Sequence, residues 1–227
     1  MKFLIIGGSG RSGRLVIEEA LSKGHQITAL VRNPSSLEER EGLTVVKGSP
    51  LSVADIARAL ETKTYPFDAV FVTLNARRVS DSPFAAADPV NSPPRLMADS
   101  VRNAIRAMRG ATPPVPKIIV MSAVGTGNSF KNLNFLMRLV FTHTNMRLSR
   151  EDHDAVDKEL RDAPGIQFVE VRPHMLTDDE AADMKVYPDD GRGAGFMPKV
   201  SRASVARFMV QAAESSEYDG RAPVVSN

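Results

Sequence analysis

MKFLIIGGSGRSGRLVIEEALSKGHQITALVRN, residues 1–33, decides the fold of this chain. The apolar run Phe3–Ile6 has the length and composition of a strand buried on both faces of a sheet. A glycine-rich turn follows, and apolar residues then return at helical spacing until Lys23 and Gly24. A second apolar run covers Ile27–Val31. The stretch therefore predicts a strand, a helix and a second, parallel strand, with glycines at the first strand-to-helix turn.

The glycines at this turn point to a dinucleotide. In dinucleotide-binding folds one glycine makes the tight turn, one lets the diphosphate approach the backbone, and one lets the helix pack closely on the strand. The phosphates then meet free N–H groups at the positive end of the helix dipole. Two spacings fit, Gly8-x-Gly10-x-x-Gly13 and Gly7-x-x-Gly10-x-x-Gly13, the second being that of short-chain and extended dehydrogenase-reductases. A glycine-rich turn without a ligand is the alternative, but the order of strand, turn, helix and strand favours a cofactor site. Its predicted residues are Gly7, Gly10, Arg11, Ser12 and Gly13.

The residue after the second strand selects the cofactor. NAD-selective folds carry Asp or Glu there, which accepts a hydrogen bond from the ribose 2′-hydroxyl. This chain has Arg32, whose guanidinium can bind a 2′-phosphate in a bidentate way, whereas a carboxylate would repel it. Arg11, inside the glycine turn, is a second cation within reach of the same phosphate. The alternative for Arg32 is an ordinary solvated arginine at a strand end. We predict that the cofactor is NADP(H).

Length and composition limit the other function classes. The chain has 227 residues, of which 42% are hydrophobic and 25% charged, as in an ordinary globular domain. A net charge of +2 gives no support for nucleic-acid binding. No apolar run reaches the ~18 residues that a membrane span needs, and no signal-peptide pattern is seen. With no cysteine, disulfides and thiolate chemistry are excluded. A cytoplasmic setting is expected.

Apolar runs and helical stretches continue to alternate along the chain. Further strands are predicted at Leu43–Lys47, Ala69–Leu74, Lys117–Met121 and Gln167–Val171, the last of these terminated by Arg172 and Pro173. Helices are predicted after a Ser52 cap, over Leu96–Met108, over Phe130–Phe141, after a Ser149 cap with Asp152 at the third position, and after Ser201. Residues 76–94, rich in Pro, Ser and Ala, are predicted to be a long loop that serves a site.

This alternation predicts an α/β fold. Continuous apolar strands separated by helices indicate a single Rossmann-type doubly wound parallel sheet with helices on both faces. We expect one NAD(P)-binding domain over residues 1–227, with a small substrate-side portion at about residues 174–227.

Residues at the carboxyl ends of the strands are candidate ligands, because the cleft of such a sheet opens there. Those predicted to contact the cofactor are Ser49, Leu74, Asn75 and Ser122. The Ser122 hydroxyl either orients the nicotinamide or substrate, as a catalytic residue would, or makes only local turn hydrogen bonds. Arg77 and Arg78 either contact an anionic substrate or form a solvated pair in the loop.

The usual carbonyl-reducing pair is missing. A typical short-chain dehydrogenase carries Tyr-x-x-x-Lys on the helix after the fifth strand, where tyrosine gives the proton and lysine lowers its pKa. Here Tyr65, Tyr187 and Tyr218 lie elsewhere, and Asp154 stands four residues before Lys158. Interconversion of alcohols and ketones by that route is therefore not expected.

Histidines offer a thinner set of candidates. His174 follows the sixth strand, where it either faces the cleft as a proton or hydrogen-bond donor or is satisfied by backbone. His153 stands between Asp152 and Asp154, whose carboxylates favour its protonated form, and is interpreted as structural. Scattered histidines without paired ligand spacing predict no metal site.

Taken together, the chain resembles the atypical short-chain dehydrogenase-reductases of the biliverdin-IXβ reductase, or flavin reductase, type within the NmrA-like group. The resemblance spans nearly the whole chain. It rests on GGSGRSG with ALVRN, the pair Ser122-Ala123, residues 151–176 (EDHDAVDKELRDAPGIQFVEVRPHML), DGRG at 190–193 and EYDG at 217–220. It implies NADPH at the glycine turn and at the basic residue after the second strand. It also implies roles for Ser122 beside the nicotinamide and His174 at the substrate pocket, with no Tyr-Lys pair. Hydride would pass directly to a planar conjugated acceptor.

Two departures limit what the resemblance implies. Ser49-Pro50 replaces the Gly-Asp pair usual after the third strand, which affects the adenine contact, and the loop at 76–94 is longer than expected. The leading hypothesis is an NADPH-dependent reductase of a flavin-like, quinone-like or tetrapyrrole-like molecule. The alternatives are a non-catalytic NADP(H)-binding redox sensor of the NmrA type, or a tailoring isomerase, cyclase or dehydratase. The partner is a small molecule, with neither nucleic acid nor membrane; monomer and dimer are both open.

Overall fold

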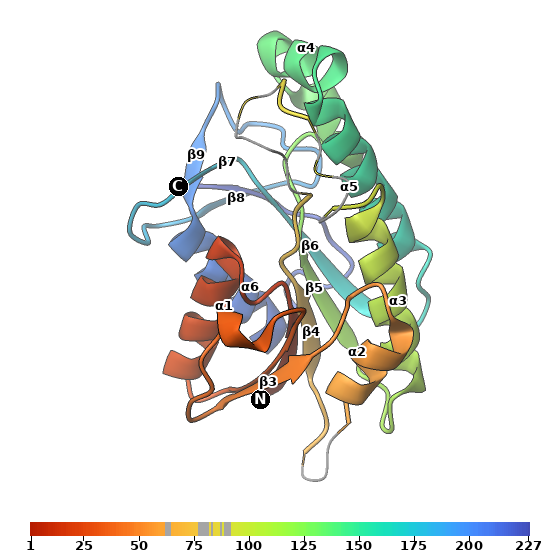
Figure 1. Cartoon of the computed structure of the whole chain (residues 1–227). Coiled ribbons are helices and arrows are strands. Elements are labelled where there is room, and N and C mark those ends of the chain that lie inside the picture. Colours follow the sequence, from red (N-terminus) through yellow and green to blue (C-terminus); the bar gives the residue numbers. More distant parts are fainter. Residues whose placement is uncertain (62–64, 77–81, 83, 87, 89–91) are drawn as a thin grey trace.

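An eight-stranded sheet runs through the centre of the computed structural model, in the order β3-β2-β1-β4-β5-β6-β10-β8 (Figure 1). The structure describes residues 1–61, 65–76, 82, 84–86, 88 and 92–227. The strands are β1 Lys2–Ile6, β2 Gln26–Val31, β3 Leu43–Lys47, β4 Ala69–Val72, β5 Lys117–Met121, β6 Gln167–Pro173, β8 Lys185–Tyr187 and β10 Val224–Ser226. Only the pairing of β10 with β8 is antiparallel among these neighbouring strands. The strand order reverses between β1 and β4, which is the switch point where such sheets bind ligands.

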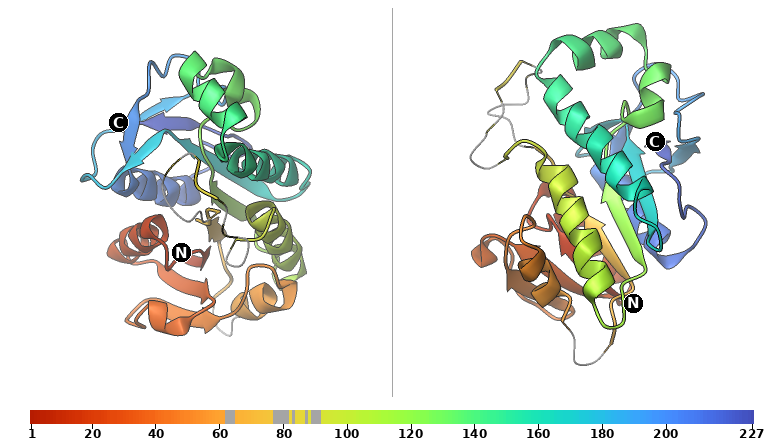
Figure 2. Two further views of the ribbon diagram at one scale, coloured as in Figure 1. Left: turned by 45° about the horizontal axis from the view of Figure 1, so that its top comes forward. Right: turned by 90° about the vertical axis from the view of Figure 1, so that its right-hand side faces the viewer.

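Helices cover both faces of the sheet. They are α1 Arg11–Ser22, α2 Val53–Ala59, α3 Leu96–Gly110, α4 Phe135–His143, α5 Met146–Arg161 and α6 Arg202–Glu214, with short 3-10 turns η1 Pro34–Ser36 and η2 Gly127–Asn132. In Figure 1, α1 and α6 lie to the left of the sheet, and α2, α3 and α5 to its right. Figure 2 shows α3 and α5 running side by side, and the two helices are in contact. The predicted α/β fold, a doubly wound Rossmann-type sheet, is confirmed.

Alternation along the strands builds two separate cores. In β1, Phe3 and Ile5 point into the core shared with α1 and α6, while Leu4 and Ile6 point into the core shared with α2, α3 and α5. All four side chains are fully buried. Successive side chains of a strand point to opposite faces, so an uninterrupted apolar run is what a strand covered on both faces requires.

The region from Phe130 to Phe141 corrects one predicted helix. The structure breaks it into η2 and α4, and α4 begins after Asn134, whose side-chain oxygen accepts a hydrogen bond from Met137 N at 2.9 Å. An asparagine that caps a helix in this way sets a helix start inside the apolar run.

Ser149 and Asp152 correct a second expectation. Helix α5 begins at Met146, so Ser149 lies within it and does not cap it. The Asp152 carboxylate instead accepts hydrogen bonds from Met97 N and Ala98 N, both at 3.0 Å. These are N–H groups of the first turn of α3, so Asp152 satisfies the start of a neighbouring helix.

The C-terminal part of the chain contains strands that sequence patterns do not predict. Strand β6 continues through Arg172 and Pro173, because Arg172 N donates to Pro223 O at 2.9 Å and the end of the chain supplies β10 as a partner. β7 Met175–Thr177 and β9 Lys199–Ser201 form a separate, short parallel pair outside the eight-stranded sheet. No helix in the described ranges has the length and apolar character of a membrane span.

Candidate dinucleotide site

A cavity of about 780 Å³ opens at the carboxyl ends of the parallel strands. Its wall includes the last residues of β1, β2 and β5, namely Ile6, Val31 and Met121, together with the glycine turn. The volume is within the range of small-molecule and cofactor sites. Of the residues predicted to bind cofactor, the structure puts in this wall Gly7, Gly10, Arg11, Ser12, Arg32, Ser49, Leu74 and Asn75.

The geometry of the glycine turn distinguishes the two possible spacings. Gly7 has φ +92°, and a Cβ there would lie 2.9 Å from the Thr73 carbonyl carbon. A Cβ on Gly13 would lie 2.2 Å from Gly7 O and 2.8 Å from Gly8 Cα, so helix α1 could not approach the strand end so closely with any side chain there. The turn is closed by Gly10 N, which donates to Gly7 O at 3.0 Å. These constraints support the spacing Gly7-x-x-Gly10-x-x-Gly13. The positive φ and the contacts with backbone fall on Gly7, and a backbone clash also on Gly13, whereas Gly8 has no positive φ and a Cβ there would meet only side chains, Ile17 Cδ1 at 3.0 Å and Ile5 Cγ2 at 3.1 Å.

The N-terminus of α1 faces this cavity without a cap of its own. The N-cap residue is Gly10, so no side chain accepts from the first N–H groups of the helix, and the first turn contains no acidic residue. Uncapped N–H groups and the positive end of the helix dipole together favour an anion such as a phosphate.

Arginines supply further positive charge to the cavity wall. Arg11 and Arg32, both expected from the sequence, lie in the wall, as does Arg202, which was not expected. The sequence signal for Arg202 was the Ser201 helix cap just ahead of it, but nothing local indicates that α6 starts beside the glycine turn. The donor set therefore fits a dinucleotide that carries several phosphates: the backbone of the glycine turn, an uncapped helix start and three guanidinium groups.

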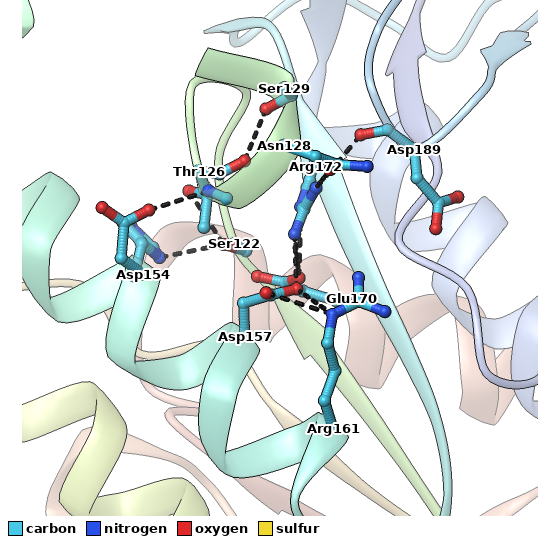
Figure 3. Close-up of polar contacts among 12 residues, drawn as sticks. Ser122, Thr126, Asn128, Ser129, Asp154, Asp157, Arg161, Glu170, Arg172 and Asp189 are labelled. Atoms are coloured by element: carbon cyan, nitrogen blue, oxygen red, sulfur yellow. Dashed lines mark hydrogen bonds and ion pairs between the residues drawn. The ribbon is translucent and has the colours of Figure 1, made fainter. Parts of the chain in front are cut away.

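Ser122 lies behind the wall rather than in it. It follows β5, is 5% exposed, and is absent from the residues that line the cavity. Its Oγ is 3.1 Å from His153 Nδ1 on α5. The same Oγ is 3.5 Å from Thr126 Oγ1, and Figure 3 shows these two residues. The structure therefore brings Ser122 together with His153, a pairing that the sequence pattern did not indicate. Contact of Ser122 with a nicotinamide stays a prediction.

His153 corrects the expectation of a protonated ring. Burial, and then the positive charge of Arg172, lower the pKa of His153 from 6.5 to about 4. The adjacent carboxylates do not oppose this, because neighbours at i±1 on a helix point away from each other. Asp152 turns toward α3, and Asp154 accepts from Gly127 N and pairs with Arg150. His153 is thus a neutral imidazole beside Ser122.

His174 has a backbone partner. Its Nδ1 lies 3.1 Å from Val225 O, its ring meets that of Tyr187 edge to face, and burial lowers the pKa of His174. It is not among the residues lining the cavity. Arg77 and Arg78 lie outside the residues that the structure describes.

A network of buried charges lies beside Ser122 (Figure 3). Arg172 is fully buried, and its Nη2 lies 2.6 Å from Asp157 Oδ1 and 2.7 Å from Glu170 Oε2. Burial raises the pKa of Glu170 to about 7, against the opposing charge of Arg172. Glu170 and Ser122 come from neighbouring strands and point to the same face of the sheet.

Comparisons with known proteins agree with this geometry. The family model described as NAD(P)H-binding matches residues 7–216 of the chain. The reductase pytE of Aspergillus terreus is 23% identical over 257 residues, which cover 97% of this chain and 95% of the relative. The oxidoreductase ylbE of Lactococcus lactis has the same fold, with a TM-score of 0.76 and 16% identity over 100% of this chain and 91% of its own. The anaerobillin reductase ChuY of Escherichia coli O157:H7 gives a TM-score of 0.75 and 16% identity over 100% and 97% of the two chains.

These findings confirm the resemblance to NAD(P)-binding reductases and support an oxidoreductase. The family match begins in the glycine turn at Gly7 and ends beyond α6, and so includes every segment that contributes to the cavity wall apart from the end of β1. The chain belongs to the NAD(P)H-binding family, and its cofactor is a nicotinamide dinucleotide.

Proposed function

We propose that the protein is an NADPH-dependent reductase that transfers hydride to a planar conjugated small molecule of the flavin, quinone or tetrapyrrole type. The observation that carries the NADPH preference is the Arg32 guanidinium, which follows β2 and lies in the wall of the cavity at the glycine turn. The nicotinamide, when bound, supplies the hydride. The anaerobillin reductase of the same fold supports a conjugated acceptor.

The chain's own residues bind and orient the cofactor in this proposal. The N–H groups at the start of α1 hold the diphosphate, and Arg32 after β2 holds the 2′-phosphate. Apolar wall residues such as Met121 and Leu176 exclude water from part of the same cavity. Excluding water favours direct hydride transfer, because competing protonation and hydrolysis are suppressed.

The Arg32→Gln variant tests the cofactor assignment. We expect its Kd for NADPH to rise by about 30-fold, since a charge-assisted bidentate contact worth ~2 kcal/mol is lost. The Kd for NADH should change less than about twofold, because NADH has no 2′-phosphate. Isothermal titration calorimetry measures both constants. Arg40→Gln is the matched control, because Arg40 pairs with Glu18 on the surface and is not in the cavity wall. A wild-type chain that prefers NADH, or equal losses for both nucleotides, would contradict the assignment.

Ser122 is proposed as a catalytic residue. His174 is proposed as a residue at the acceptor that donates a proton only in its imidazolium form, because the neutral ring gives its Nδ1 hydrogen to Val225 O. Ser122→Ala should lower kcat about tenfold with little change in KM for NADPH, which corresponds to one lost hydrogen bond in the transition state. Ser129→Ala is the control: this serine is equally buried, but its hydroxyl hydrogen-bonds with the backbone of Gly125 and Thr126. Steady-state kinetics of NADPH oxidation give both constants. A Ser122→Ala rate equal to that of the wild type removes Ser122 from the reaction, and His174→Gln is judged in the same way.

The acceptor class is tested by NADPH oxidation under anaerobic conditions with FMN, a quinone series and linear tetrapyrroles. Turnover of at least one of these above the free-solution rate supports the reductase. Binding of NADPH without turnover of any acceptor would favour a redox sensor. Conversion of a substrate without net NADPH consumption would favour an isomerase, cyclase or dehydratase. If Arg77 and Arg78 contact an anionic acceptor, their replacement by Gln raises the KM for carboxylated acceptors selectively.

A further inference from the structure

Arg202 is held at the dinucleotide cavity by the way α6 begins. Ser201 caps α6, with its side chain accepting from Ser204 N, and Arg202 is the first residue of the helix. Helix α6 packs against α1, so its start and the glycine turn contribute to the same cavity. The Arg202 side chain is only 11% exposed. A guanidinium that has lost most of its water requires an anion close by.

Within the part of the chain that the structure describes, Arg202 pairs with one carboxylate, and that carboxylate is exposed. Asp178 Oδ1 lies 2.6 Å from Arg202 Nη1, and Asp178 Oδ2 lies 3.7 Å from Arg11 Nη1. The Asp178 side chain is 69% exposed and stands in the segment after β7, so it extends from a third element toward the two arginines. One carboxylate thus joins the glycine turn to the start of α6.

Charge and geometry make Asp178 a weak partner for Arg11. Its contact with Arg11 is long and is made between side chains that are 66% and 69% exposed, where an ion pair contributes little. A diphosphate seated at the uncapped start of α1 would carry two negative charges beside Arg11. Guanidinium groups bind phosphate oxygens in a bidentate way, with more charge per contact than a carboxylate offers.

We propose that Arg202 is a ligand of the cofactor's diphosphate, and that Asp178 is an internal competitor which releases Arg11 when the nucleotide binds. The inference rests on the proposed dinucleotide site and adds a third cation to it. Arg32 selects the 2′-phosphate at one end of the cavity, whereas Arg202 acts on the phosphates that NADPH and NADH share. Arg202 should therefore affect both nucleotides alike.

A double-mutant cycle over Arg202→Gln and Asp178→Asn separates direct binding from charge neutralisation. We expect R202Q to weaken NADPH and NADH binding at least tenfold, and D178N to tighten both about threefold. The double variant should remain at least fivefold weaker than D178N, since removing the competitor does not restore the lost ligand. Calorimetry with NADPH, NADH and inorganic diphosphate supplies the constants.

Two controls make the result specific. Arg207→Gln removes an exposed arginine of the same helix and should bind all ligands as the wild type does. Adenosine 2′-monophosphate lacks the diphosphate, so R202Q should change its affinity less than twofold. Thermal unfolding of each variant reports whether it folds, and Arg202→Lys keeps the charge at this place if R202Q is unstable.

Each other outcome overturns the inference. If D178N fully restores binding to R202Q, then Arg202 only neutralises Asp178. If R202Q weakens adenosine 2′-monophosphate as strongly as NADPH, its role is structural. Failure of the proposed function is distinct: the wild type would bind neither nucleotide, and the inference would then stand only if inorganic diphosphate bound in an Arg202-dependent way and fall if it did not.

Discussion

Replacing Arg172 with methionine should lower the free energy of unfolding by about 3–5 kcal/mol, because it leaves the buried Glu170 carboxylate without its counter-charge and Asp157 with Arg161 alone. Arg172 and Glu170 are both fully buried, and Asp157 is 17% exposed. The same guanidinium also donates to Asn128 Oδ1 at 2.7 Å and to Asp189 O at 3.0 Å. One substitution thus removes the partner of two acids and two neutral acceptors. Urea denaturation followed by circular dichroism measures the loss.

The companion variants test whether unpaired charge is the cause. The double variant Arg172→Met with Glu170→Met replaces a buried ion pair by apolar side chains, which is often neutral, so it should recover more than half of the loss. Arg147→Met is the matched control: Arg147 pairs with Glu151 on the surface, where an ion pair is worth less than about 1 kcal/mol. A loss below about 1 kcal/mol for Arg172→Met, or a double variant no better than the single one, would refute the explanation.

Arg172 also marks where prediction from sequence reached its limit. Arg172 and Pro173 looked like the end of the sixth strand, because arginine and proline rarely occur inside a buried strand. The strand continues because Pro223 O and Val225 O, about fifty residues later, accept from Arg172 N and His174 N. The buried charge is satisfied by α5 and by the segment around Asp189. No local pattern carries information about such partners.

The first half of the site, in contrast, follows from local rules. Gly7 and Gly13 are required by local geometry, namely a positive φ at Gly7 and the close approach of the backbone at Gly13. A strand–turn–helix unit also fixes which residue follows the second strand, so the sequence alone assigns Arg32 to the cavity, where it lies. Such positions depend on neighbours close in sequence.

The second half depends on contacts between distant segments. Arg202 reaches the cavity only because α6 packs beside α1, and His153 meets Ser122 only because the fold brings α5 next to the residue that follows β5. Asp152 was predicted at the third position after a Ser149 cap, and its carboxylate instead accepts from the first turn of α3. The sequence predicts the chemistry that a side chain can perform, whereas the topology of the fold determines which partner that side chain contacts.

The second large effect expected is a pair of opposite pH dependences within the buried network. Burial and the charge of Arg172 keep the pKa of His153 at about 4, below its ordinary 6.5. Below about pH 6.5 the unfolded chain therefore binds a proton at His153 that the folded chain does not bind. For this group, the free energy of unfolding falls as the pH falls. Burial raises the pKa of Glu170 to about 7, above its ordinary 4.5. The folded chain takes up that proton first, so this group adds stability as the pH falls toward about 4.5.

These contributions oppose each other in the wild type and are separated by substitution. Between about pH 7.5 and about pH 4.5, the free energy of unfolding of His153→Gln should rise by about 2–3 kcal/mol relative to that of the wild type. Over the same pH range, the free energy of unfolding of Glu170→Gln should fall by a similar amount relative to that of the wild type. Urea denaturation at the two pH values gives both differences, and groups common to all variants cancel. His143→Gln, at an exposed histidine, is the control for losing an imidazole as such. Shifts of the same sign for the two buried variants would mean that burial does not move the pKa values of His153 and Glu170 in opposite directions.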